Sequence, residues 1–194
     1  MVKDTKQRIV HAAAALFMER GYSASGLKQI AATSGAPIGS LYHFFPGGKS
    51  ELAAETLRVA GRAYQDLVLA VFDAAPDAVA GVRDCFEGAA AVLVASDYAD
   101  ACPVATVALE VASSDEVLRE VTDEIFQSWI GAACDRLIAA GANSDRSREL
   151  ATLWIGALEG GFLLCRASKS TYPMQAIGRA IEELVAAELG GPVE

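Results

Sequence analysis

The spacing of apolar residues runs at helical period through almost the whole chain. Apolar side chains recur every three or four residues, alanine is frequent, and no segment sustains the apolar–polar alternation of a half-buried strand. The pattern predicts an all-α protein. Because 53% of the 194 residues are hydrophobic, the chain can bury a core and still expose apolar surface, so we expect a homodimer.

Glycine, proline and serine divide the first fifty residues into short segments. We expect helices at about 4–20, 25–33 and 37–44. Gly21 follows the first segment as a C-terminal stop, Ser25 is the expected N-cap of the second, and Pro37 suits the first turn of the third. Two short helices joined by a glycine-containing turn, the second exposing small and polar groups, are typical of a helix-turn-helix.

The remaining residues predict longer helices. We expect these near 49–74, 77–95, 103–112, 114–140, 145–167 and 173–189. A helix over 49–74 would be about 39 Å long, enough to link two parts of a protein as a lever. The sequence therefore predicts two domains, a three-helix head over residues 1–48 and a helical body over 49–194.

The charge of the chain is divided unevenly between its two parts. The net charge is −9, which by itself disfavours binding to nucleic acid. Residues 1–50, however, hold six Lys and Arg against two Asp and Glu, a net charge of +4, while the rest carries −13. A basic head on an acidic body would present one face to a polyanion.

The stretch from Gly35 to Leu52, GAPIGSLYHFFPGGKSEL, strongly resembles the DNA-binding domains of the TetR family. Its Pro-Gly-Gly-Lys loop, together with CPVATVALE from Cys102 to Glu110, is similar to the LmrA/YxaF-type subgroup. The resemblance implies an N-terminal helix-turn-helix head, a C-terminal helical body for ligand binding and dimerisation, and repression of drug-efflux or detoxification genes until a small molecule releases the protein.

The resemblance implies a set of DNA contacts on the second and third helices and the following loop. The expected DNA-binding residues are Ser25, Lys28, Ile38, Gly39, Ser40, Tyr42, His43 and Lys49. Lys49 has independent support, because it lies at a helix N-terminus, where backbone N–H groups already attract an anion.

Each of these residues also has a simpler structural interpretation. Ile38 stands where the subgroup often has a basic residue, and it would either touch a thymine methyl or shield the helix pair. Tyr42 alternatively closes the small core of the head, and His43 is alternatively an exposed turn residue. Lys28 and Lys49 are alternatively ordinary solvated charges.

In the body, large side chains beside small ones favour an apolar ligand cavity, with core packing as the default interpretation. The candidate ligand-binding residues are Phe86, Cys102, Leu109, Phe126, Trp129, Trp154 and Phe162. Glu110 would orient a polar group of the ligand or remain a solvated carboxylate. The small residues of the run 156–161 would let a helix of a second subunit approach closely, or would serve close packing within one subunit.

Several classes of function lack the residues that they need. Gly48-Lys49-Ser50 imitates the end of a phosphate-binding loop, but the position of the first glycine is His43. No nucleophile is paired with a general base, so we expect no enzyme activity. Two histidines and four scattered cysteines predict free thiols, no metal site and no cofactor. No apolar run approaches the roughly 18 residues of a membrane span, so we expect a cytoplasmic protein without a membrane partner.

The sequence thus predicts a ligand-responsive, dimeric TetR-type repressor whose partners are a double-stranded palindromic operator and a small, apolar or aromatic effector. One alternative stays open. An all-α dimer with a basic head is also compatible with docking to an acidic protein surface without binding DNA.

Overall fold

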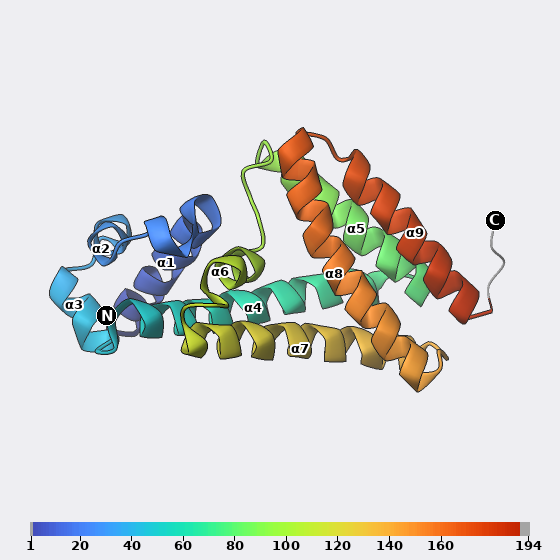
Figure 1. Cartoon of the computed structure of the whole chain (residues 1–194), viewed down its shortest axis with the longest axis horizontal. Helices are drawn as coiled ribbons and strands as arrows, with labels where there is room; N and C mark the ends of the chain where they lie inside the picture. Colours follow the sequence, from blue (N-terminus) through green and yellow to red (C-terminus); the bar gives the residue numbers. More distant parts are fainter. Residues whose placement is uncertain (1, 191–194) are drawn as a thin grey trace. The chain divides into compact units, whose positions relative to one another are not determined.

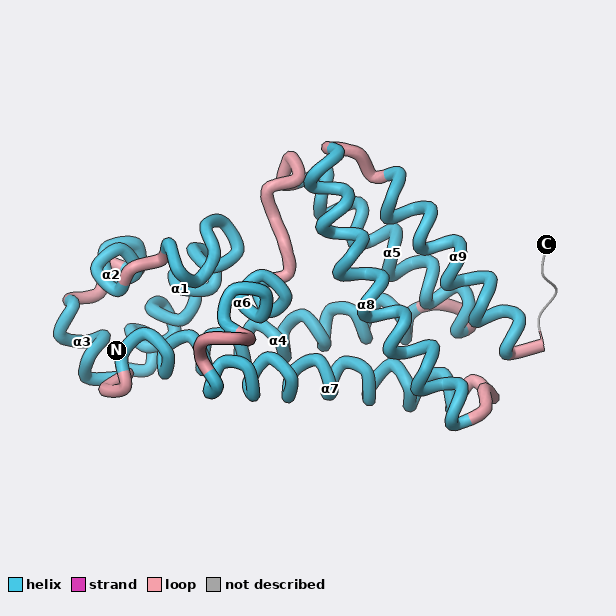
Figure 2. The backbone as a smooth tube through the Cα atoms, viewed as in Figure 1, coloured by secondary structure: helices cyan, strands magenta, loops and turns pink. Residues whose placement is uncertain are grey.

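The computed structural model describes the backbone of residues 2–190 and the side chains of residues 4–190. These residues form helices joined by short loops (Figures 1 and 2). The helices are α1 (Val2–Ala24), α2 (Leu27–Ser34), α3 (Ile38–Phe44), α4 (Gly48–Ala74), α5 (Ala78–Ala95), α6 (Pro103–Val111), α7 (Glu116–Ala139), α8 (Ser144–Ser168) and α9 (Tyr172–Glu188). The all-α prediction is confirmed for the described residues, and each predicted helix is found within a few residues of its expected bounds.

The chain forms two compact units that do not follow a single cut in the sequence. The first unit comprises the residues up to Ala63 together with 101–125, and the second comprises 64–100 together with the residues from Phe126 onwards. Helices α4 and α7 therefore contribute residues to both units. A division into a head over 1–48 and a body over 49–194 stays a prediction about function.

The core of the first unit is built on one face of α1. Ile9, Ala13, Leu16 and Phe17 lie four, three and one residues apart along this helix, and all are buried. Helices α2 and α3 pack on α1 through Ile30 and Leu41, which are fully buried as the apolar spacing predicts. The core of a helix-turn-helix is thus formed by the residues that the sequence pattern indicates.

Helix α1 is broken near its end, as expected from Gly21. This residue has φ 80° and ψ 172°, far from helical values, and a further turn follows before Ala24. The prediction that Ser25 is the N-cap of α2 is wrong. Gly26 holds the N-cap position and supplies no side chain, whereas the hydroxyl of Ser25 donates hydrogen bonds to the Leu16 and Gly21 carbonyl oxygens.

In the second unit, α5, α8 and α9 pack side by side (Figure 1). Gly178 of α9 and Gly161 of α8 permit close approach, because a Cβ at these positions would press on Phe86 and Met174 respectively. Helix α8 is long enough and apolar enough, by length and mean hydropathy alone, to cross a membrane. Its buried side chains, among them Trp154 and Leu158, are those of a core helix in this unit.

The four cysteines are buried free thiols, as predicted. Burial raises the pKa of Cys85 to about 12, and the nearby carboxylates of Asp84 and Asp73 act in the same direction. A thiol with so high a pKa holds little reactive thiolate near neutral pH. Cys102 has a structural role, because its sulfur accepts a hydrogen bond from the Ala105 N–H and so caps α6.

Candidate DNA-binding surface and effector cavity

The turn between α2 and α3 is fixed by local hydrogen bonds. Gly35 ends α2 in the left-handed conformation, with φ 63°, and its N–H points back to the Ala31 and Ala32 carbonyl oxygens. Ser34 is buried and its hydroxyl donates to the Ala31 carbonyl oxygen while it accepts from the Ala36 N–H. The two short helices are therefore held at a defined angle by the backbone between them.

The outward face of α3 is exposed and carries most of the predicted DNA contacts. Ile38 and Tyr42 are 41% and 54% exposed, and Gly39 and His43 are also exposed. Ser40 is half-buried. Tyr42 consequently does not close the core of the head, a role that falls to Leu41 and Phe45. Lys28 on α2 is exposed as well, so its ammonium is accessible to an anion.

Two of the predicted DNA-binding residues do not have freely exposed side chains. Ser25 is completely buried and both of its hydroxyl contacts are internal, so its side chain is not available to DNA in this structure. Lys49 lies half-buried, with its ammonium 3.4 Å from the Ser23 carbonyl oxygen and 4.2 Å from the centre of the Tyr22 ring. Burial lowers the pKa of Lys49, although the nearby Glu110 carboxylate opposes that change.

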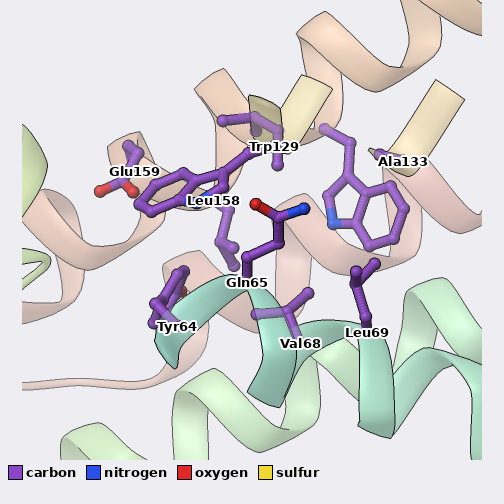
Figure 3. Close-up of a pocket in the computed structure, with 10 residues that line it drawn as sticks. Tyr64, Gln65, Val68, Leu69, Trp129, Ala133, Leu158 and Glu159 are labelled. Atoms are coloured by element: carbon purple, nitrogen blue, oxygen red, sulfur yellow. The ribbon is translucent and has the colours of Figure 1, made fainter. Parts of the chain in front are cut away.

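A cavity in the second unit lies among α4, α7 and α8. Its lining residues are Tyr64, Gln65, Val68, Leu69, Trp129, Ala133, Trp154, Ile155, Leu158 and Glu159. Figure 3 shows Gln65 extending from α4 toward Trp129, with Val68 and Leu69 further along the same helix. The volume is only about 20 Å³, room for about one water molecule.

Aromatic rings form much of the lining of this cavity, and the indole N–H of one of them makes no hydrogen bond within the described range 2–190. The Tyr64 and Trp129 rings are 5.1 Å apart, and Trp154 lies 5.6 Å from Phe72. Trp154 is 1% exposed, and its indole N–H has no hydrogen-bond partner among the residues that the structure describes. In the arrangement described, the cavity is too small for a ligand. In an expanded arrangement its aromatic lining would suit a flat apolar molecule, and the Trp154 N–H would be an available hydrogen-bond donor.

Models of two protein families match the chain, one in each part. Residues 9–56 match the model described as bacterial regulatory proteins of the tetR family, and residues 78–180 match the C-terminal domain of LmrA/YxaF-like transcriptional regulators. The chain belongs to the TetR family of transcriptional regulators. The resemblance seen in the sequence is confirmed, and the matches are to regulators of transcription and not to enzymes.

Individual relatives cover almost the whole of this TetR-family chain. The HTH-type transcriptional regulator YxaF of Bacillus subtilis is 35% identical over 94% of the chain and 95% of its own length. The regulator LmrA of the same organism is 31% identical over 94% of the chain and 97% of its own length. A crystal structure of the regulatory protein TetR from Rhodobacter sphaeroides superposes with a TM-score of 0.80 at 20% identity, over 91% of this chain and 96% of the other, and supports the fold.

The cavity contains only part of the predicted ligand set. Trp129 and Trp154 line it, whereas Phe126 packs edge-on against Trp129 and Phe162 is buried elsewhere in α8. The other three predicted residues do not line it. Phe86 borders a different groove between α5 and α9, Cys102 caps α6, and Leu109 is 83% exposed on α6.

The α4 residues of the cavity were missed because that helix was interpreted as a lever. The spacing of Tyr64, Val68 and Leu69 places them on one helical face, and this was the available signal. Glu110 also has a role that neither earlier interpretation included. Its carboxylate accepts hydrogen bonds from the backbone of α1.

The run of small residues in α8 serves two purposes. Gly161 faces inward against Met174 and Ile177 of the same chain, whereas added Cβ atoms at Gly156 and Gly160 would meet open space. Leu153, Leu163 and Leu164, on the same side of α8, are between 46% and 63% exposed. One part of the run thus packs within the subunit and the other belongs to an uncovered apolar face.

Proposed function

We propose that the chain is a TetR-type repressor that binds a palindromic operator as a homodimer and is released by a small apolar or aromatic effector. The observation that carries the proposal is the exposed face of α3, which presents Gly39, Tyr42 and His43 beside a buried, well-packed helix-turn-helix core. Small and polar groups on such a face suit the major groove. Lys28 and Ser40 complete the proposed contact set, with Ile38 available to a thymine methyl.

A homodimer is supported by the apolar face of α8 and α9. Three leucines of α8 are exposed, and α9 also exposes Ala180 and Leu184, which lie three and seven residues beyond the half-buried Ile177 on one face of that helix. Exposed apolar patches of this kind mark protein interfaces. We propose that α8 and α9 form a four-helix interface with the same helices of a second copy. Such a dimer would present two α3 helices to successive major grooves, about 34 Å apart.

The effector proposal rests on the cavity among α4, α7 and α8. A small-molecule site usually has a volume of roughly 300 to 1,000 Å³, far above the present 20 Å³. An effector must therefore bind an expanded arrangement of these helices and draw the population away from the closed one. Because α4 contributes to both units, we propose that it carries this change to the DNA-binding helices.

The proposed setting follows the family resemblance. We propose that the protein acts in the cytoplasm and controls efflux or detoxification genes, as the LmrA/YxaF-type pattern implies. An apolar aromatic cavity suits the kind of molecule that such genes remove.

Selection of bound duplexes from a random pool tests the proposed function. The wild-type protein is expected to enrich a palindrome, and Lys28→Ala is expected to bind it more weakly, with the salt dependence of log K reduced by about one. Glu120→Gln on α7 is a control outside the proposed surface. Failure to enrich any sequence at modest salt concentration would contradict the proposal and favour docking to an acidic protein.

A further inference from the structure

The break in α1 exposes backbone groups that the helix no longer satisfies. At Gly21 the chain leaves helical geometry, and the N–H groups of Tyr22 and Ser23 point away from the preceding turn. N–H groups without an acceptor in the helix occur at the N-terminal end of every helix, and they need a partner. Here the partner comes from a distant part of the sequence.

Glu110 of α6 receives both of these N–H groups. Its Oε1 accepts from Tyr22 and its Oε2 from Ser23, each at 2.8 Å. Gly21 makes the approach possible, because a Cβ at this position would collide with the Glu110 carboxylate. Burial works against ionisation of Glu110, but the hydrogen bonds from Ser23 and Tyr22 and the charge of Lys49 outweigh it and lower the pKa of the carboxyl.

Lys49 and Ser25 hold the same segment from its other sides. The Lys49 ammonium, at the start of α4, contacts the Ser23 carbonyl oxygen and the face of the Tyr22 ring. The buried Ser25 hydroxyl donates to the Gly21 carbonyl oxygen at 2.7 Å. The segment 21–25 is therefore fixed by side chains from α4 and α6 as well as its own, and all of these residues lie in the first unit.

This segment leads directly into α2, which begins at Leu27. We propose that Glu110 is a positioning residue for DNA binding, which sets the placement of α2 and α3 by holding the backbone of Tyr22 and Ser23. The proposal rests on the proposed function, since it assigns a role in operator binding. It also makes α6 the element through which a displacement would reach α2.

The sign of the expected effect separates positioning from simple electrostatics. Removing a negative charge from a DNA-binding unit ordinarily strengthens its attraction to phosphates. If Glu110 positions α2, its neutralisation weakens operator binding instead. Glutamine is a sharp probe, because its single amide oxygen can replace one carboxylate oxygen while its NH₂ group would face the other N–H donor.

The test compares wild type, Glu110→Gln and Glu120→Gln in two measurements. Glu120 is an exposed carboxylate of the same unit, only 3.9 Å from Arg119, and serves as the matched loss of charge. The first measurement is the affinity, against salt concentration, for the duplex that wild type enriches from a random pool. The second is hydrogen exchange at the Tyr22 and Ser23 amides, which needs no DNA.

Glu110→Gln is expected to weaken duplex binding about tenfold without a change in salt slope, a coupling of ordinary size. The Tyr22 and Ser23 amides are expected to exchange faster, with the unfolding temperature close to that of wild type. Glu120→Gln should bind as tightly as wild type or slightly more tightly. Unchanged exchange in Glu110→Gln, or unchanged or tighter binding, would overturn the proposal. If wild type binds no duplex, the proposed function and this role in DNA binding both fail, while the exchange data still show whether Glu110 holds the segment.

Discussion

Gly21 adopts a backbone conformation that is open almost only to glycine. Its φ of 80° combined with a ψ of 172° lies outside the regions that residues with a Cβ adopt. The sequence indicates a helix stop at this position, and that prediction is confirmed. What the sequence does not indicate is the carboxylate of Glu110, 89 residues away, against which a side chain at 21 would press.

Replacement of Gly21 by alanine is expected to destabilise the protein. Backbone strain and displacement of Glu110 together are expected to cost about 2 kcal/mol, which lowers the unfolding temperature by about 4–8 °C. Differential scanning calorimetry measures the change. Gly131→Ala is the matched control, because Gly131 lies inside α7 with open space at its Cβ, and alanine there should slightly stabilise the helix. Equal unfolding temperatures for Gly21→Ala and wild type would show that the strain is absent.

Trp154→Phe tests the unused donor in the cavity. Phenylalanine keeps an aromatic ring but removes the indole N–H, which has no partner in the described part of the chain. An effector that carries a hydrogen-bond acceptor and releases the enriched duplex is expected to bind this variant about fivefold more weakly, the value of one ordinary hydrogen bond. Titration calorimetry with the effector and with an analogue that lacks the acceptor gives the comparison. Equal losses for both molecules would exclude a role for the N–H.

Side-chain direction was the least predictable property at this scale. The family resemblance implied that Ser25 and Lys49 contact DNA, and Lys49 was also expected to do so from its position at a helix N-terminus. In the structure both side chains donate to backbone carbonyl oxygens of the chain. A sequence gives the donor and not the acceptor that lies nearest in the fold. Tyr42 and His43 are exposed, as predicted for the outward face of α3. Leu41 fixes this orientation, because its burial turns the opposite side of the short helix toward the core.

Helices were predictable because their signals are local. Apolar spacing identifies each one, and Gly35, Pro46 and Asn143 mark breaks whose cause lies within a few residues. The cavity was less predictable, since its walls come from three helices that are far apart in the sequence. Trp129 and Trp154 line the cavity, but the same interpretation of large aromatic residues also selected Phe86, Phe126 and Phe162, which do not line it. Val68 and Leu158 resemble any other core residue in the sequence.

At the scale of one element, α8 has an inner face that is buried within the subunit and an outer face that is exposed. Its inner face carries Trp154, Leu158 and Gly161, all buried within the subunit. Its outer face carries Gly156, Gly160 and Leu163, where open space surrounds the glycines and the leucine is 63% exposed. Such a face is costly in water unless another apolar surface covers it.

Leu163→Glu is expected to weaken or abolish the dimer. A carboxylate in the centre of an apolar interface would be desolvated without a partner, which favours the separated subunits. Sedimentation equilibrium gives the mass of the species in solution. Leu109→Glu is the matched control, because Leu109 is 83% exposed on α6 and lies outside the proposed interface. Identical masses for both variants and wild type would contradict an α8 interface.

For the whole molecule, the uneven distribution of charge has a functional meaning. The helix-turn-helix lies in the basic first fifty residues, whereas the cavity and the uncovered α8 face lie in the acidic remainder. In the proposed mode of DNA binding, a chain with net charge −9 presents its basic part to the duplex, because the acidic remainder is repelled by the phosphates. Sequence preference then depends on α3, because phosphate contacts fix register but do not distinguish bases.

The central claim is that the protein binds DNA sequence-specifically as a dimer. It is tested most directly by the ratio of the dissociation constants for a specific and a scrambled duplex. The wild-type protein is titrated with the enriched palindrome and with a scrambled duplex of equal length and composition at about 0.15 M salt, where charge alone gives weak binding. A sequence-specific repressor is predicted to bind the palindrome at least about a thousandfold more tightly, with two subunits on each duplex. Equal affinity for both duplexes, falling equally with salt, would contradict it.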